Sequence, residues 1–125
     1  MKYFLSLGSN INAHKNLDFA NKELSNLLTN LQFSSVHRTK AEGFDGDDFL
    51  NSVVAGESDL TFDNLNKKLK LIEDAAGRNR NAPKFSARTL DIDIVLQIDS
   101  ENEIIYESDE IEKYAFVSGP LKEVI

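Results

Sequence analysis

Two aspartates separated by one residue, Asp91 and Asp93, are the clearest candidates for chemistry in this chain. They lie in an otherwise apolar segment, and because successive side chains of a β-strand point to opposite faces, both carboxylates are predicted to share one face. The other face is predicted to carry Leu90, Ile92, Ile94 and Leu96. Two neighbouring carboxylates repel each other unless a cation lies between them, and their hard oxygen atoms suit Mg²⁺. The pattern favours a magnesium site and a solvent-facing strand about equally.

A basic segment precedes this strand. Residues 77–88 carry four cationic side chains, Arg78, Arg80, Lys84 and Arg88. Phosphoryl transfer depends mainly on positioning and charge neutralisation, so cations beside two carboxylates favour a polyphosphate bound together with magnesium. Any one of these residues alone is equally well explained as a solvated surface charge. The sequence contains no P-loop motif that could bind the phosphates instead.

A third candidate site lies in the middle of the chain. Phe49 and Asn51 alternate onto one face of a predicted strand that follows the loop 43–48. An aromatic ring can stack on a flat heterocycle, and an amide can hydrogen-bond to its edge. Ordinary packing explains Phe49 at least as well. Asn51 is the stronger candidate, because asparagine is depleted in strands and a buried amide needs partners.

Composition narrows the class of protein. The chain has 125 residues, 41% hydrophobic and 28% charged, which is typical of one globular domain, here residues 1–125. The absence of cysteine excludes disulfides and thiolate metal sites, so a metal would be held by oxygen. A net charge of −7 argues against nucleic-acid binding. No apolar run is long enough to span a membrane and no signal peptide is evident, so we expect a cytoplasmic protein.

Hydrophobic periodicity predicts the order of the elements. Strands are expected at residues 3–7, 31–36, 49–57 and 90–96, and helices are expected with apolar stripes over 17–31 and 62–76, with Thr61 as a helix cap and Gly77 as a helix stop. A short hairpin at 104–106 and a closing segment at 116–125 complete the chain. The order strand, helix, strand, strand, helix, strand is that of an α+β, ferredoxin-like split βαβ sandwich, an antiparallel sheet with helices packed on one face.

Four segments together resemble one known family. They are residues 7–10 (LGSN), 49–54 (FLNSVV), 77–80 (GRNR) and 85–94 (FSARTLDIDI). In this order they are similar to the motifs of the 6-hydroxymethyl-7,8-dihydropterin pyrophosphokinases, enzymes of folate biosynthesis. The resemblance extends over nearly the whole chain. It implies transfer of pyrophosphate from ATP to the hydroxymethyl group of a reduced pterin, giving AMP and the pterin diphosphate.

The resemblance also implies a role for each matched residue. Asp91 and Asp93 would hold two Mg²⁺ ions, and with Arg78 and Arg88 they would form the catalytic set. The pterin would be bound by Gly43, Phe49, Asn51 and Phe116. ATP would be bound by Arg78, Arg80, Lys84, Phe85, Arg88 and Ile94. The expected partners are these small molecules alone, with no nucleic acid and no membrane, and the expected state is a monomer. Glu73 is assigned to local support of the site.

Two departures from the family pattern concern the nucleotide. Phe85 stands where the family usually has tryptophan. The tail from residue 99 to 112 is acidic, whereas the family commonly has basic and histidine residues that help to bind ATP. These departures leave an alternative open, a noncatalytic homologue that binds a pterin or nucleotide as a sensing or interaction module.

Overall fold

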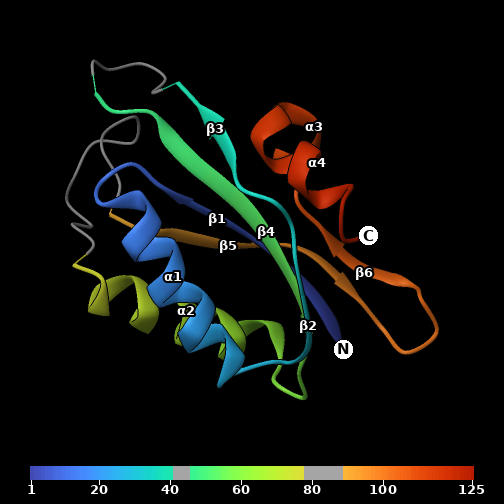
Figure 1. Cartoon of the computed structure of the whole chain (residues 1–125). Coiled ribbons are helices and arrows are strands. Elements are labelled where there is room, and N and C mark those ends of the chain that lie inside the picture. The colour runs from blue at the N-terminus through green and yellow to red at the C-terminus, as the bar shows by residue number, and fades with distance from the viewer. Residues whose placement is uncertain (41–45, 78–88) are drawn as a thin grey trace.

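The computed structural model describes residues 1–40, 46–77 and 89–125 (Figure 1). The strands are β1 (Lys2–Ser9), β2 (Thr29–Phe33), β3 (His37–Thr39), β4 (Phe49–Glu57), β5 (Asp91–Ile98) and β6 (Ile104–Glu107). The helices are α1 (Ala13–Ser25), α2 (Phe62–Ala75), α3 (Glu110–Lys113) and α4 (Ala115–Leu121). No helix in the described ranges is both long and apolar enough to cross a bilayer.

The strands form one antiparallel sheet in the order β2-β4-β1-β5-β6. The short β3 pairs with β4 along the same edge as β2. β1 and β4, far apart in sequence, run side by side over their whole length, and β5 flanks β1 on the other side. The sheet therefore places the motif residues of β4, β1 and β5 next to one another.

The two long helices cover one face of the sheet, below and to the left of the strands in Figure 1. Leu17, Ala20 and Leu24 of α1 recur at helical spacing and pack on the sheet together with Leu65 and Leu69 of α2.

The ends of α2 follow the local sequence signals. The Thr61 hydroxyl accepts the backbone N–H of Asn64 at 3.2 Å, which caps the first turn. Gly77 adopts φ 94°, the left-handed conformation that glycine tolerates at a helix end. The predicted cap, the predicted stop and the α+β ferredoxin-like class are confirmed.

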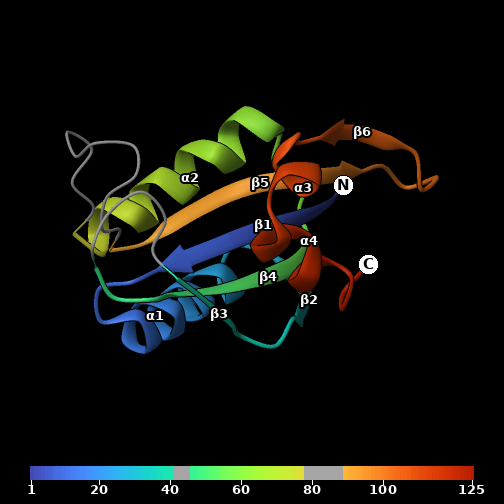
Figure 2. The ribbon, with the colours of Figure 1, turned by 90° about the horizontal axis from the view of Figure 1, so that it is seen from above.

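A smaller layer covers part of the opposite face. Val117 and Leu121 of α4 pack with Phe4, Val53 and Val95 of the central strands. Figure 2, seen from above, shows α4 crossing over β4 and β1. The sheet therefore separates two hydrophobic clusters, a large one under α1 and α2 and a small one under α3 and α4.

Three details differ from the prediction. The helix expected to continue to residue 31 ends at Ser25, and Leu31 lies in β2 instead. The strand expected at 31–36 ends at Phe33, and a separate strand that was not expected, β3, begins at His37. Between them the Ser34 hydroxyl accepts the Val53 N–H at 2.8 Å in place of a regular ladder bond. The alternation of β5 also ends early. A register shift against β1 between Phe4 and Leu5 places both Val95 and Leu96 in the smaller cluster, so the assignment of Leu96 to the face of Ile94 was wrong.

Candidate active site

Asp91 and Asp93 lie on the same face of β5, as the alternation predicts. Leu90, Ile92 and Ile94 are buried in the large cluster on the side of α1 and α2, so the two aspartates project from the opposite side. Both are half-buried. In the register with β1, Asp93 pairs with Ser6 and Asp91 with Gly8. The pair therefore lies on the side of the sheet that α4 covers only in part.

Two contacts fix the position of the strand that carries the aspartates. The Ser9 hydroxyl at the end of β1 donates to the carbonyl of Thr89, just before β5. From α2, the carboxylate of Glu73 accepts the backbone N–H of Ile92 at 2.7 Å. Glu73 is fully buried, and Ile92 lies between the two aspartates. This hydrogen bond agrees with the supporting role assigned to Glu73.

The environment of Asp93 disfavours its ionised form. Burial, followed by the nearby carboxylates of Asp91 and Glu110, raises the pKa of Asp93 to about 7. One cation offsets part of this effect, because Lys70 Nζ lies 3.9 Å from Asp93 Oδ1. A divalent cation between the aspartates would relieve their repulsion.

The donor set fits magnesium. Mg²⁺ in proteins is often bound by one or two carboxylates and completed by water and substrate phosphates. In the described part of the chain, no three His, Cys, Asp or Glu side chains form a group that could hold a metal. A cation at this face would be bound by the two aspartates, with water and substrate phosphates available as further ligands.

Asn51 lies in the same row of the sheet as Asp91. Gly8 of β1 pairs with Asn51 on one side and with Asp91 on the other. Asn51 is buried, and its amide nitrogen donates to the hydroxyl of Thr39 at 2.8 Å. A Cβ atom at position 8 would lie 3.1 Å from the Asn51 side-chain oxygen, closer than ordinary packing allows. Glycine therefore gives the amide room between the two candidate subsites.

The aromatic residues of the predicted site approach from two elements. Phe49 is half-buried and lies on the same face of β4 as Asn51. Phe116 is in α4, where its ring stacks on Tyr114 with centroids 4.7 Å apart and an interplanar angle of 18°. The structure thus places both rings on the side of the sheet that carries the aspartates.

Contacts at the end of the chain hold α4 beside β3. His37 Nε2 lies 2.5 Å from Glu123 Oε2, and the same carboxylate accepts the backbone N–H and the hydroxyl of Ser35. These three interactions lower the pKa of Glu123 to about 2, with the backbone N–H of Ser35 contributing most. His37 also pairs with Asn51 in the register of β3 and β4. The clamp therefore connects the helix of Phe116 to the strand next to Asn51.

Two residues near the aspartates were not identified from the sequence. Lys70 was overlooked, although it lies three residues before Glu73 and such spacing brings two side chains of a helix together. Glu110 had no signal in the sequence beyond the acidity of the tail. It comes close because Ser108 N–H donates to the Val95 carbonyl at 2.9 Å, which brings the start of α3 alongside β5.

Several predicted residues lie outside the described part of the chain. They are Gly43, Arg78, Arg80, Lys84, Phe85 and Arg88. Ile94 is described and is 5% exposed, with its side chain in the large cluster. A nucleotide contact at Ile94 would therefore involve its main chain.

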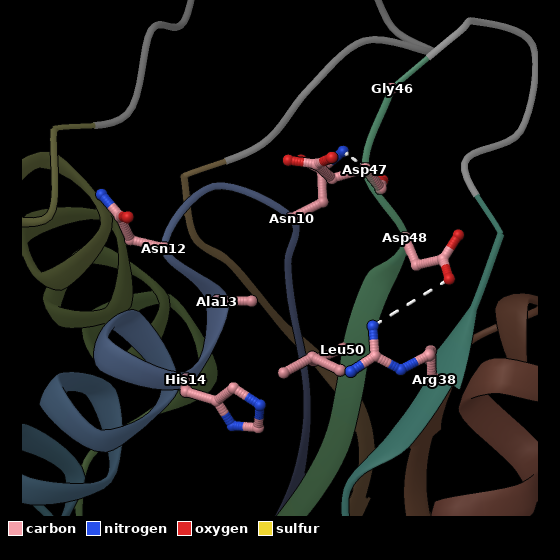
Figure 3. Close-up of a pocket in the computed structure, with 9 residues that line it drawn as sticks. All are labelled: Asn10, Asn12, Ala13, His14, Arg38, Gly46, Asp47, Asp48 and Leu50. Carbon is pink, nitrogen blue, oxygen red and sulfur yellow. Dashed lines mark hydrogen bonds and ion pairs between the residues drawn. The ribbon is translucent and has the colours of Figure 1, made fainter.

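An open pocket of about 460 Å³ lies elsewhere, between the start of α1, β3 and the residues before β4 (Figure 3). Asn10 donates to the Asp47 carbonyl at 3.0 Å, and Arg38 lies 4.0 Å from Asp48 across the pocket. Its apolar wall includes Leu50, which belongs to the large cluster. This wall of the pocket therefore lies on the α1 side of the sheet, whereas the two aspartates project from the opposite side.

Comparison with known proteins identifies the family. The model of the 7,8-dihydro-6-hydroxymethylpterin-pyrophosphokinase (HPPK) family matches residues 4–125, which include both aspartates and Asn51. The chain belongs to the HPPK family. The resemblance noted in the sequence is thereby confirmed, and the match extends from β1 to the end of the chain, beyond the motif segments.

Individual relatives agree with the family match. A pyrophosphokinase of Aquifex aeolicus, named 2-amino-4-hydroxy-6-hydroxymethyldihydropteridine pyrophosphokinase, is 34% identical over 98 residues, which cover 77% of this chain and 61% of the relative. The folate synthesis bifunctional protein of Chlamydia trachomatis is 35% identical over 99 residues, which cover 73% of this chain and 22% of the relative. The chain therefore spans about a fifth of the bifunctional relative and about three fifths of the shorter one.

Proposed function

We propose that this HPPK-family protein transfers pyrophosphate from ATP to 6-hydroxymethyl-7,8-dihydropterin in folate biosynthesis. One observation carries the proposal. Two half-buried aspartates lie on the same face as a buried amide, and a glycine separates the amide from the first aspartate. A cation site and a heterocycle site would thus be neighbours on one rigid sheet, as a transfer between a nucleotide and a heterocycle requires.

The reaction itself is a displacement at the β-phosphorus of ATP. The hydroxymethyl oxygen of the pterin forms a bond to this phosphorus and loses its proton, while the bond from the phosphorus to the oxygen of the α-phosphate breaks. AMP leaves, and the pterin carries the diphosphate. When bound, Mg²⁺ would neutralise the charge of the triphosphate and orient it.

We assign the residues of the sheet as follows. Asp91 and Asp93 would hold the cations, two ions by analogy with the family. Asn51, which already donates to Thr39, would direct its amide to the edge of the pterin. Phe49 and Phe116 would flank the pterin ring, which requires the ring of Phe116 to leave or extend its stack with Tyr114.

The remaining assignments rest on the family motif. Arg78 and Arg88 would bind phosphates, because a guanidinium pairs with phosphate through two parallel hydrogen bonds. Arg80, Lys84, Phe85 and Ile94 would complete the nucleotide site, and Gly43 would border the pterin. Residues 1–125 would form one pyrophosphokinase-like domain. Location in the cytoplasm and a monomeric state stay predictions.

One observation favours a second candidate function. Glu110 adds a further carboxylate that acts on Asp93, and a triphosphate bound at Asp93 would meet this negative charge. A protein that binds the pterin but has lost the reaction would tolerate this charge. The second candidate is therefore a noncatalytic pterin-binding relative.

Incubation with ATP, Mg²⁺ and 6-hydroxymethyl-7,8-dihydropterin separates the two candidates. We expect AMP to form only when the pterin is present, as measured by chromatography of the nucleotides. Absence of AMP, from folded protein that binds the pterin in a calorimeter, would reject the enzyme and support the binding protein. AMP formed without pterin would indicate a different acceptor and would reject both.

A further inference from the structure

Lys70 occupies a position that the HPPK motif does not explain. Its ammonium lies 3.9 Å from Asp93 Oδ1 and 3.5 Å from Glu73 Oε1, so one cation contacts both carboxylates. The Lys70 side chain is 37% exposed and that of Asp93 is 40% exposed. The ammonium therefore lies at the solvent-accessible border of the aspartate site and neutralises part of its charge.

The two carboxylates hold Lys70 differently. Glu73 is fully buried, and its other carboxylate oxygen accepts the Ile92 N–H. The Glu73 carboxylate is therefore held in one position. Asp93 is more exposed and belongs to the pair with which a divalent cation would interact. A cation at Asp93 would repel the ammonium, whereas the Glu73 carboxylate would continue to attract it. Lys70 can thus move without leaving the site.

A lysine beside the two aspartates could also bind a phosphate group. Its ammonium carries three donors on a flexible stem and binds phosphate as a point charge. If the lysine is displaced from Asp93, Glu73 still lies beside its ammonium, and a triphosphate bound with the cation would offer a second anionic partner. The tail from residue 99 to 112 is acidic and carries no Lys or Arg, so it supplies no cation for a nucleotide.

We propose that Lys70 is the counter-ion of Asp93 in the cation-free protein, and that a divalent cation displaces it toward the phosphates of the bound nucleotide. The first half concerns the protein and the cation alone. The second half rests on the proposed function, because it requires a nucleotide at the aspartates.

The first half is tested by titrating Mn²⁺ into the protein without nucleotide or pterin, with free Mn²⁺ measured by electron paramagnetic resonance. Lys70→Gln removes a competing charge, so we expect Mn²⁺ to bind about fivefold more tightly than to the wild type, the size typical of a half-exposed ion pair. Lys70→Arg keeps the charge and should bind Mn²⁺ like the wild type. Lys68→Gln, an exposed position on the same helix, is the matched control and should also have no effect.

The second half is tested by calorimetry with a nonhydrolysable ATP analogue at saturating Mn²⁺. Here Lys70→Gln should weaken nucleotide binding by about fivefold, because a phosphate contact is lost. The variant is thus expected to change the two affinities in opposite directions. A merely structural lysine would leave both unchanged or weaken both.

Clear results would overturn the inference. Unchanged or weaker Mn²⁺ binding in Lys70→Gln would reject the counter-ion, and unchanged nucleotide affinity would reject the phosphate contact. Asp93→Asn distinguishes this failure from failure of the proposed function: if this variant binds Mn²⁺ like the wild type, the cation does not bind at Asp93 and both proposals fail. AMP formation together with unaltered Mn²⁺ binding in Lys70→Gln would reject the role of Lys70 alone.

Discussion

Gly8 is the residue on which the spacing of the site depends. It lies between Asn51 and Asp91 in the row of paired residues, and a Cβ here would meet the Asn51 side-chain oxygen at 3.1 Å. We predict that Gly8→Ala moves the amide by a few tenths of an ångström and weakens pterin binding roughly tenfold, about the effect of one lost hydrogen bond.

Calorimetry with the pterin, together with urea unfolding, checks this prediction. The free energy of unfolding should change by less than about 1 kcal/mol, since only one side chain has to move. Gly119→Ala is a suitable control, because a Cβ there would make an ordinary 3.6 Å contact with the His37 ring. Pterin affinity that is equal in Gly8→Ala and the wild type would show that Asn51 does not bind the pterin.

Ionised Asp93 is predicted to lower the free energy of unfolding when no cation is bound. Its pKa is raised from 3.8 to about 7, so the folded state holds the proton more tightly than the unfolded state. The folded state therefore loses stability as the pH rises from about 4 to about 7. We predict that Asp93→Asn stabilises the protein by about 1–2 kcal/mol at pH 8, less than the full shift implies because the side chain is 40% exposed.

Urea unfolding in EDTA at pH 5 and pH 8 measures this effect. The advantage of Asp93→Asn over the wild type should be larger at pH 8 than at pH 5. Mg²⁺ should stabilise the wild type and not the variant. An advantage that grows toward low pH would mean that ionised Asp93 is stabilised by its surroundings, contrary to the account.

For single residues, the sequence correctly predicted which side chains of β5 share a face, because alternation along a strand determines this. Asp91 and Asp93 share a face because side chains alternate along a strand, and Ile92 and Ile94 lie in the core for the same reason. Glu110 could not be predicted, since its distance from Asp93 depends on how β6 and the following chain pair with β5. Such long-range register is not encoded in local patterns.

Among the elements, α4 depends on a polar clamp at the surface. Glu123 accepts hydrogen bonds from Ser35 and contacts His37, and its pKa is lowered to about 2 from an ordinary value of 4.5. A lowered pKa means that the ionised form is favoured by folding. The clamp's contribution to stability is therefore complete above about pH 4.5 and is lost as the pH falls toward 2.

We predict that Glu123→Gln lowers the urea midpoint relative to the wild type by a constant amount between pH 7 and pH 5. The difference should then shrink below pH 4.5. Because the clamp lies beside the helix of Phe116, the variant should also weaken pterin binding. Glu112→Gln, an exposed change in the neighbouring α3, should do neither. A midpoint difference that is independent of pH down to 3 would show that the charge of Glu123 is not what holds the helix.

The elements were predicted where their signals are local. The α1 stripe as far as Leu24, the α2 stripe, the cap at Thr61 and the stop at Gly77 all depend on neighbouring residues, and β4 was predicted with its observed bounds. The end of α1 was placed too late, because Leu28 and Leu31 continue the apolar spacing beyond the helix. The break at Ser34 and the irregular register near Val95 depend on contacts with another strand. A pattern within one segment cannot reveal such interruptions.

For the molecule as a whole, the sequence predicted the class and the sheet with its main helical layer. It did not predict the second layer, because α3 and α4 are short and their apolar residues have no clear period. This layer covers only part of the face that carries Asn51 and the aspartates. The HPPK fold thus uses one face of the sheet for stability and shares the other between packing and the candidate site.

The most direct test of the central claim is the initial rate of pterin-dependent AMP formation in the wild type, Asp91→Asn and Asp93→Asn at saturating Mg²⁺. If the aspartates hold the cations of the reaction, each variant should be folded and should lose at least about 1,000-fold in rate, comparable to the loss of one main electrostatic group of an active site. Either variant with a rate within tenfold of the wild type would contradict the account, because the chemistry would then not depend on this face of β5.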